Sequence, residues 1–132
     1  MRIREPSKAK DDRGAAAVEF ALVLPLLLLL LGGIIDFGFA FNTQISLTHA
    51  AREGVRHYAV EKDVDEAEAV ARAAFTAPAT TPATAVVDRT CPSENGARVV
   101  VKANSRIFFM GLLPFVDNQL PLEGQAVMRC GG

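Results

Sequence analysis

The pattern of hydrophobic and polar positions divides the chain into a short polar head, a long apolar run and a mixed body. Residues 1–14 (MRIREPSKAKDDRG) are polar and without periodicity, which is typical of a short disordered leader. The apolar run extends over residues 15–41 and is interrupted only by Glu19 and Asp36. Since about 20 apolar residues cross a bilayer as a helix, this run predicts one transmembrane span, with one or both acids near its ends.

No helix stop follows the apolar run. Residues 42–62 (NTQISLTHAAREGVRHYAVEK) place apolar side chains at helical spacing, so we expect one continuous helix over about residues 15–60 that passes from lipid into water. Pro25 lies inside this helix and predicts a kink or local unwinding. Gly32 and Gly33 predict a weak point or a patch of close packing.

A second, shorter helix is expected immediately afterwards. Asp63 resembles an N-cap and Glu66 follows three residues on, which together form a capping box. The Pro- and Thr-rich residues 76–84 (TAPATTPAT) then predict a loop. The buried face of this short helix is expected to contain Ala67, Val70, Ala71 and Ala74.

The rest of the body is predicted to form strands. The β-branched segments at residues 85–90 (AVVDRT) and 97–103 (ARVVVKA) flank Asn95–Gly96, a hairpin turn signal. Residues 120–130 (LPLEGQAVMRC) alternate in polarity and place Cys130 on the inward face. We therefore predict an α+β fold: a long N-terminal helix, transmembrane and then amphipathic, packed on a small antiparallel sheet.

The apolar residues 106–116 (RIFFMGLLPFV) are ambiguous between strand and loop. Such a run is more often core than contact surface. A domain this small cannot always bury so much apolar surface, however, and an exposed remainder would be a docking patch for partner subunits.

Charge suggests the orientation and the domain organisation. Residues 1–14 carry five basic and three acidic side chains, whereas only Arg52 and Arg56 are basic within fifteen residues after the apolar run. The positive-inside rule then predicts a cytoplasmic leader at residues 1–14, a transmembrane span at 15–41 and an extracytoplasmic domain at 42–132. A basic head before an acidic body is not the charge profile of a nucleic-acid binder.

The two cysteines, Cys91 and Cys130, both lie in the predicted extracytoplasmic body. An even count in a small domain outside the cytoplasm favours a disulfide, and two unrelated buried thiols are the alternative. Closing a loop of about 40 residues would stabilise the domain by on the order of 4 kcal/mol in the chain-entropy model.

The sequence offers little support for catalysis or for metal binding. His49 and His57 are eight residues apart on one helix and could not bind one metal ion without further ligands. We find no phosphate loop, nucleophile motif or cofactor signature, so we expect no enzyme activity, no cofactor and no metal site.

Glu19 stands where a carboxylate is costly, inside the N-terminal end of the apolar run. It either marks the edge of the span, with its carboxylate at the headgroups, or it has a partner. If a protease cut after Gly14, the new ammonium of Ala15 would lie near the membrane surface. In an assembly of parallel helices, Glu19 of one subunit could pair with that ammonium of its neighbour and fix the stagger between subunits.

This arrangement resembles the processing site of Flp-type prepilins, with Phe20 where those usually carry Tyr. The opening RGAAAVEFALVLPLLLLLLGGIIDFG and the segment HAAREGVRHYAV at residues 49–60 are similar to two hallmarks of the TadE-like pseudopilins of the tight-adherence (Tad) pilus system. VMRC near the end resembles the closing strand of that family. The resemblance covers residues 13–60 strongly and the remainder only in outline.

The resemblance implies a role and partners. Gly14 would precede the cut and Ala15 would follow it, with the membrane prepilin peptidase as the enzyme and this chain as its substrate. The mature chain would be a minor pilin-like subunit that helps to assemble or prime an adhesive fibre, in contact with other pilin or pseudopilin subunits and the Tad machinery. The mixed charge of the leader and a length far above that of a major Flp pilin depart from the pattern.

Arg52, Glu53 and Arg56 belong to the second hallmark. They fit a surface network of little energetic value, and a subunit contact is the alternative. Gly54 costs up to about 1 kcal/mol relative to Ala within a helix, so we expect a close neighbour there.

Two other classes of protein remain open. Gly38 and Ala40 form an A-x-A-like site, at which a signal peptidase would release a soluble domain. The chain could also be an uncut single-pass anchor that presents an envelope binding domain. Neither alternative requires Glu19 at its distance from Gly14, and the helical pattern runs straight through Ala40.

Overall fold

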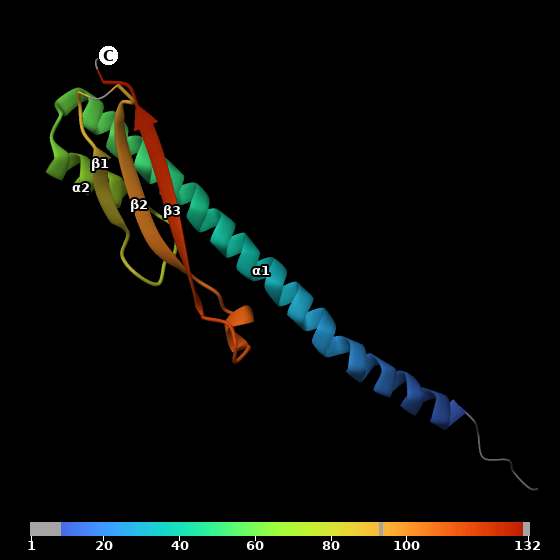
Figure 1. Ribbon diagram of the computed structural model, residues 1–132. Helices are drawn as coiled ribbons and strands as arrows, with labels where there is room; N and C mark the ends of the chain where they lie inside the picture. Colours follow the sequence, from blue (N-terminus) through green and yellow to red (C-terminus); the bar gives the residue numbers. More distant parts are fainter. Residues whose placement is uncertain (1–8, 93, 131–132) are drawn as a thin grey trace, which may run out of the picture.

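The computed structural model describes residues 9–92 and 94–130, and its most prominent feature is one long helix that projects from a small body (Figure 1). Helix α1 extends over Ala9–Glu61, about 80 Å at 1.5 Å per residue. Helix α2 (Val64–Ala74) follows, and then come strands β1 (Thr84–Arg89) and β2 (Ala97–Arg106), the short 3₁₀ helix η1 (Met110–Leu112) and strand β3 (Gln119–Met128). The predicted α+β fold is confirmed.

Helix α1 begins earlier than the sequence pattern predicted. Residues 9–14 are helical, so the expectation of a disordered leader is wrong for them, and residues 1–8 lie outside the described part. Gly14 stands at the join with the apolar run, but a single glycine costs only about 1 kcal/mol relative to Ala within a helix, and α1 continues across it. The helix is also uninterrupted at Pro25, so the expected unwinding does not occur.

The strands form an antiparallel sheet in the order β1-β2-β3. Val86 pairs with Val100, and Val101 pairs with Gly124. Gly96, in the turn between β1 and β2, has a φ of +78°, which glycine adopts without strain, as the Asn–Gly signal predicted. One face of the sheet packs against α1 and α2, and the other faces outward (Figure 1).

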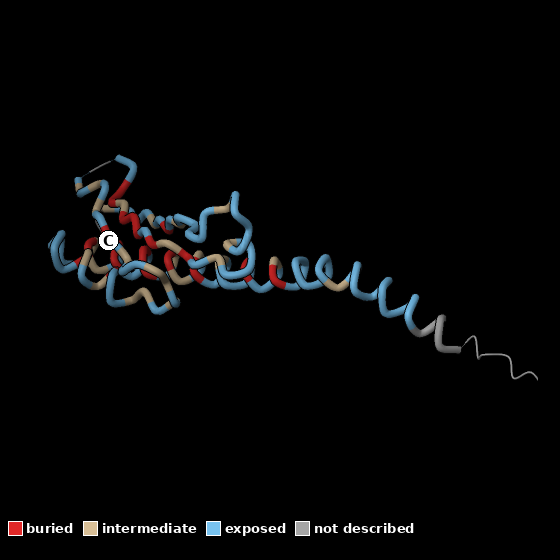
Figure 2. The backbone as a smooth tube through the Cα atoms, turned by 90° about the horizontal axis from the view of Figure 1, so that it is seen from below, coloured by how far each residue is buried: buried red, intermediate tan, exposed pale blue. Residues whose placement is uncertain are grey.

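The core lies between the C-terminal half of α1, helix α2 and the inner face of the sheet (Figure 2). Alternate residues of β2 point inward, as expected for a half-buried strand. In α2, Ala67 and Ala71 are buried, and Asp63 accepts a hydrogen bond from the Glu66 N–H at 3.0 Å, so the predicted cap is confirmed. The fully buried larger side chains are Leu47, Val55, Val99, Val101, Thr43 and Ser105.

The apolar residues 107–115 do not join this core. They form a loop around η1 in which most side chains are exposed, so the expectation that this run is mainly core is wrong. The loop leaves the sheet at Arg106, the residue that pairs with Gln119 at the start of β3. It lies beside α1, at the end of the sheet nearer the N-terminal half of that helix (Figure 1).

Candidate functional site

The N-terminal half of α1 presents the residues predicted for processing and subunit pairing. Gly14, Ala15, Glu19 and Phe20 are all exposed, and a Cβ added at Gly14 would meet no atom within 4 Å. Within the described part of the chain, Glu19 makes no ion pair. Any partner of this carboxylate therefore comes from outside the described residues.

The surface of α1 around Glu19 is apolar over residues 15–41. One window of this helix has a mean hydropathy of 2.6, and only 6% of it is buried, so α1 is long and apolar enough to cross a membrane. Such a surface needs either lipid or other apolar helices around it. Its exposed large side chains are Val18, Phe20, Leu22, Val23, Leu26, Leu27, Leu28, Leu29, Leu30, Leu31, Ile34, Ile35, Phe37, Phe39 and Phe41.

Asp36, the second acid of the apolar run, attaches the loop between β2 and β3 to α1, a role that the sequence did not predict. Its expected place near the end of the span stays a prediction. Its side chain is 4% exposed, and its carboxylate accepts three backbone hydrogen bonds from that loop. The donors are the N–H groups of Phe108 at 2.9 Å and of Phe109 and Met110 at 2.8 Å each.

Gly32 lies one turn before Asp36 and completes this attachment. A Cβ on Gly32 would stand 2.5 Å from the Cγ atom of Phe109, closer than side chains approach. The Phe109 ring thus packs directly on the bare backbone of α1. The close-packing interpretation of this glycine is confirmed, whereas Gly33 faces open space.

The second predicted contact segment lies where α1 packs against α2. Arg52, Glu53 and Arg56 are exposed, and no ion pair among the described residues joins them, so the expected network is absent there. Gly54 is buried, and a Cβ on it would stand 2.7 Å from that of Ala71. Its close neighbour is therefore α2 of the same chain, and the three charged side chains remain free for a partner.

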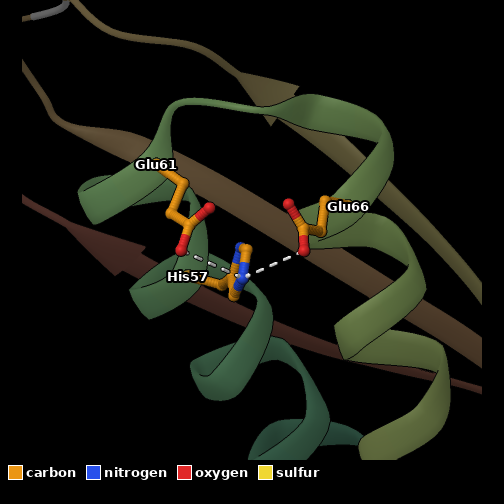
Figure 3. A group of neighbouring side chains, drawn as sticks. All are labelled: His57, Glu61 and Glu66. Carbon is orange, nitrogen blue, oxygen red and sulfur yellow. Dashed lines mark ion pairs between the residues drawn. The ribbon is translucent and has the colours of Figure 1, made fainter.

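One cluster of potential metal ligands was missed by the sequence reasoning. Nε2 of His57 lies 3.9 Å from a carboxylate oxygen of Glu61 and 3.8 Å from one of Glu66 (Figure 3). Glu61 follows His57 at helical spacing, but Glu66 comes from α2, and only the turn between the helices brings it there. Both carboxylates are more than half exposed, so we interpret the group as surface contacts of the imidazole, one within α1 and one across the turn between the helices. His49 is not part of it.

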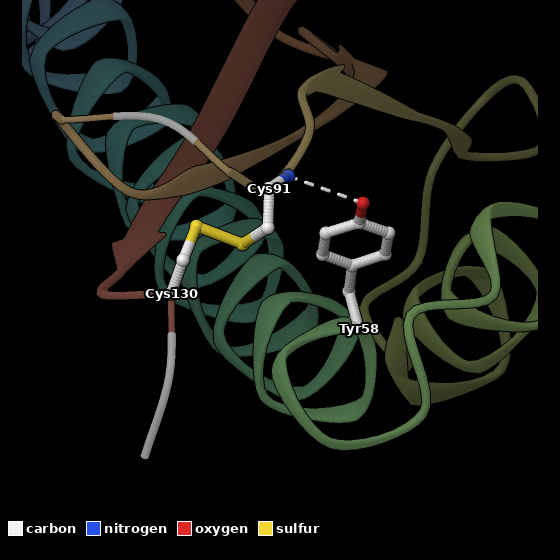
Figure 4. Close-up of a disulfide and its surroundings, with 3 residues drawn as sticks. All are labelled: Tyr58, Cys91 and Cys130. Atoms are coloured by element: carbon white, nitrogen blue, oxygen red, sulfur yellow. Dashed lines mark hydrogen bonds between the residues drawn. A yellow bond between two sulfur atoms is a disulfide. The ribbon is translucent and has the colours of Figure 1, made fainter.

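The predicted disulfide between Cys91 and Cys130 is present, with the Cα atoms 5.6 Å apart (Figure 4). The Cys91 N–H also donates a hydrogen bond to the hydroxyl of Tyr58 at 3.2 Å. The C-terminal end of β3, the segment after β1 and the last turns of α1 are thus joined at one place.

Comparison with known families singles out the segment that carries these exposed residues. Residues 14–56 match the TadE-like protein family. The TadE-like resemblance seen in the sequence is confirmed over this range, which begins at Gly14 and ends at Arg56. The closing strand VMRC lies outside the TadE-like match. No curated protein and no solved structure matches the chain significantly.

Proposed function

We propose that the protein is a minor pilin-like subunit, a pseudopilin, that is cut after Gly14 by a prepilin peptidase and acts in the assembly or priming of a Tad/Flp-type adhesive pilus. The observation that carries this proposal is the TadE-like match, which begins at Gly14 and continues along an exposed apolar helix with Glu19 near its start. The chain is the substrate of the peptidase and has no enzyme activity of its own.

The membrane topology follows from charge and from the disulfide. The basic leader stays in the cytoplasm, α1 crosses the inner membrane, and the sheet domain lies in the periplasm. The Cys91–Cys130 disulfide supports this side for the domain, because disulfides persist in oxidising compartments.

Glu19 acts in subunit pairing. Ala15 and Glu19 are four residues apart, about 6 Å along a helix axis. A neighbouring helix shifted by roughly one turn would therefore bring its own Ala15 ammonium opposite Glu19. Each charge alone is costly in an apolar medium, so pairing offsets both costs and selects this stagger.

Partners would meet the chain at two places on α1. The apolar surface around Phe20 would pack on the helices of other pilin or pseudopilin subunits. The exposed Arg52, Glu53 and Arg56 lie beyond the span and would contact subunits or the Tad assembly machinery. Their lack of ion pairs among the described residues leaves all three charges available.

The two alternative classes differ in how much of α1 they retain. Cleavage after Ala40 would remove Asp36 and Gly32, and with them the attachment of the loop between β2 and β3. That attachment and the unbroken helix favour retention of the span. An uncut anchor keeps both contacts and differs from a pseudopilin only in processing.

The intact mass of the protein purified from the membranes of its native host tests the proposal. We expect a chain that begins at Ala15, lighter by a further two hydrogens for the disulfide. A Gly14→Leu variant, bulky next to the cut, should keep its leader. The matched control is Gly38→Leu, at an open position of the same helix, which should be processed normally. A wild-type chain that retains residues 1–14 would instead support the uncut anchor, and a soluble product that begins at Phe41 would support secretion.

A further inference from the structure

The loop between β2 and β3, residues 107–118, exposes more apolar surface than its size explains. Phe115 is 96% exposed, Leu112 is 80% exposed and Phe108 is 62% exposed. Met110 and Leu113 add to the same loop. Apolar side chains gathered in one surface segment mark a contact with another apolar medium.

The attachment to α1 fixes where this loop lies along the helix. Asp36 holds the N–H groups of Phe108, Phe109 and Met110, and Phe109 packs on Gly32. Both contact residues belong to the apolar part of α1, and the N-terminal part of this helix projects beyond the sheet (Figure 1). The loop therefore reaches back from the sheet along the proposed transmembrane segment.

The depth of the loop follows from helix geometry. A hydrocarbon core of about 30 Å takes up about 20 helical residues. If the core begins at Ala15, it ends near residue 34, and if it begins at Phe20, it ends near residue 39. Gly32 lies inside the core in both cases, by about 3 to 10 Å. Its neighbour Phe109 is then at the depth of the acyl chains.

A non-helical loop at this depth needs partners for its backbone polar groups, because lipid offers none. Asp36 supplies acceptors for three successive N–H groups. Backbone bonds satisfy others: Ile107 donates to Asn118 at 3.0 Å, and Leu113 donates to Met110 at 3.1 Å. The acid in the apolar run thus makes it possible for irregular backbone to lie in an apolar medium.

The chemistry at the neck of the loop also fits a phospholipid. An apolar hollow of about 220 Å³ is lined by Phe39 of α1, by Phe108 of the loop, and by Pro78, Ser105 and Arg106. Arg106 is exposed where the loop leaves the sheet. An arginine in the lining of an apolar hollow offers a phosphate contact beside space for an acyl chain.

We propose that residues 107–116 insert into the leaflet on the side of the sheet domain and form a second membrane contact beside α1, with Arg106 at the level of the lipid phosphates. The occupant of this surface is lipid, because the exposed loop continues the exposed apolar surface of α1 at the same depth. This inference rests on the proposed insertion of α1 in the membrane. This second membrane contact would hold the sheet domain close to the bilayer and fix the orientation of the domain before assembly.

The chain contains no tryptophan, so the fluorescence of a single introduced Trp reports the surroundings of that position without background from other Trp residues. The full-length protein would be reconstituted in phosphatidylcholine–phosphatidylglycerol vesicles with and without bromine on the acyl chains, which quenches a nearby indole. Phe115→Trp reports on the loop, with Leu112→Trp as a second position. Leu28→Trp marks the span. Val127→Trp is the control in water, because it is exposed on β3 about 26 Å along the strand from Gln119.

We expect Phe115→Trp to lose as large a fraction of its emission to brominated acyl chains as Leu28→Trp does, at every protein-to-lipid ratio, while Val127→Trp loses none. If Leu28→Trp is quenched but both loop variants emit as Trp does in water, the loop proposal is overturned and the insertion of α1 still stands. Blue-shifted loop emission that brominated lipid does not quench, and that fades on dilution in lipid, would assign the surface to a second copy instead. An unquenched Leu28→Trp would overturn the membrane insertion of α1 and the loop proposal together.

Discussion

The carboxylate of Asp36 accepts hydrogen bonds from three successive backbone N–H groups, of Phe108, Phe109 and Met110. A buried carboxylate is costly unless its oxygens are satisfied, and here one oxygen takes one bond and the other takes two. Hydrogen bonds to a charged group contribute about 1.5–3 kcal/mol each, more than neutral ones. This one residue therefore holds the loop between β2 and β3 against α1.

An Asp36→Asn variant retains the shape of the side chain but replaces one acceptor oxygen with an NH₂ group, which cannot accept a bond. We expect the attachment of the loop to weaken by about 2 kcal/mol, and the amides of residues 108–110 to exchange with solvent about 30-fold faster. Hydrogen exchange of the reconstituted protein measures this. Asp117→Asn, an exposed acid of the same loop, is the matched control. Unchanged exchange in Asp36→Asn would show that the three bonds do not hold the loop.

At the scale of elements, the helices and the sheet approach one another through glycines. A Cβ on Gly124 of β3 would overlap the carbonyl carbon of Leu47 and stand 2.6 Å from its oxygen. Gln44 of α1 donates a side-chain hydrogen bond to the carbonyl of Glu123, next to this crossing, at 2.8 Å. Gly54 plays the same part between α1 and α2. These glycines let α1 lie close enough to bury the small side chains around it.

A Gly124→Ala variant tests this crossing, because the clashing atoms belong to the backbone of Leu47 and cannot rotate away. We expect a loss of about 2–3 kcal/mol in the free energy of unfolding, the scale of an overpacked core. Urea unfolding in detergent micelles, followed by circular dichroism, measures it. Gly38→Ala makes the same chemical change at an open position of α1 and should leave stability equal or slightly higher. Equal stabilities of Gly124→Ala and wild type would argue against a tight crossing.

At the scale of the whole molecule, the sequence predicted features that depend on near neighbours. The continuous helix, the Asp63 cap, the hairpin turn and the α+β class follow from local periodicity and turn chemistry. The cysteine pair followed from count and compartment. The TadE-like segment was recognised from two short motifs, and the family comparison covers the same region.

The features that the sequence could not predict join distant parts of the chain. Asp36 and its donors are more than 70 positions apart, and periodicity shows which face of a helix is apolar but not what covers it. The position of residues 107–118 beside α1 could not be predicted from the sequence for the same reason. Glu66 reaches His57 only because the turn after α1 folds α2 back. Leader residues 9–14 were expected to be disordered because they lack a pattern, yet the helix simply continues through them.

The role of Glu19 is tested in the assembly, because this exposed acid of the apolar run makes no ion pair among the described residues. A Glu19→Gln variant removes the charge but retains the size, so the fold, the disulfide and the cleavage after Gly14 should be unchanged. If Glu19 pairs with the Ala15 ammonium of a neighbour, its loss leaves that ammonium unpaired in an apolar medium. Such a broken pair costs about 3–5 kcal/mol, which corresponds to more than about a hundredfold in subunit affinity.

We therefore expect the Glu19→Gln chain to accumulate in the host membrane at a normal level and with the mature mass, while the yield of sheared pili falls. Asp65→Asn is the control, since it removes an exposed acid of α2 that lies outside both proposed contact segments of α1. Normal pilus yield from Glu19→Gln would leave Glu19 as a carboxylate at the membrane edge. A Glu19→Gln chain that keeps its leader would mean instead that this acid serves recognition by the peptidase.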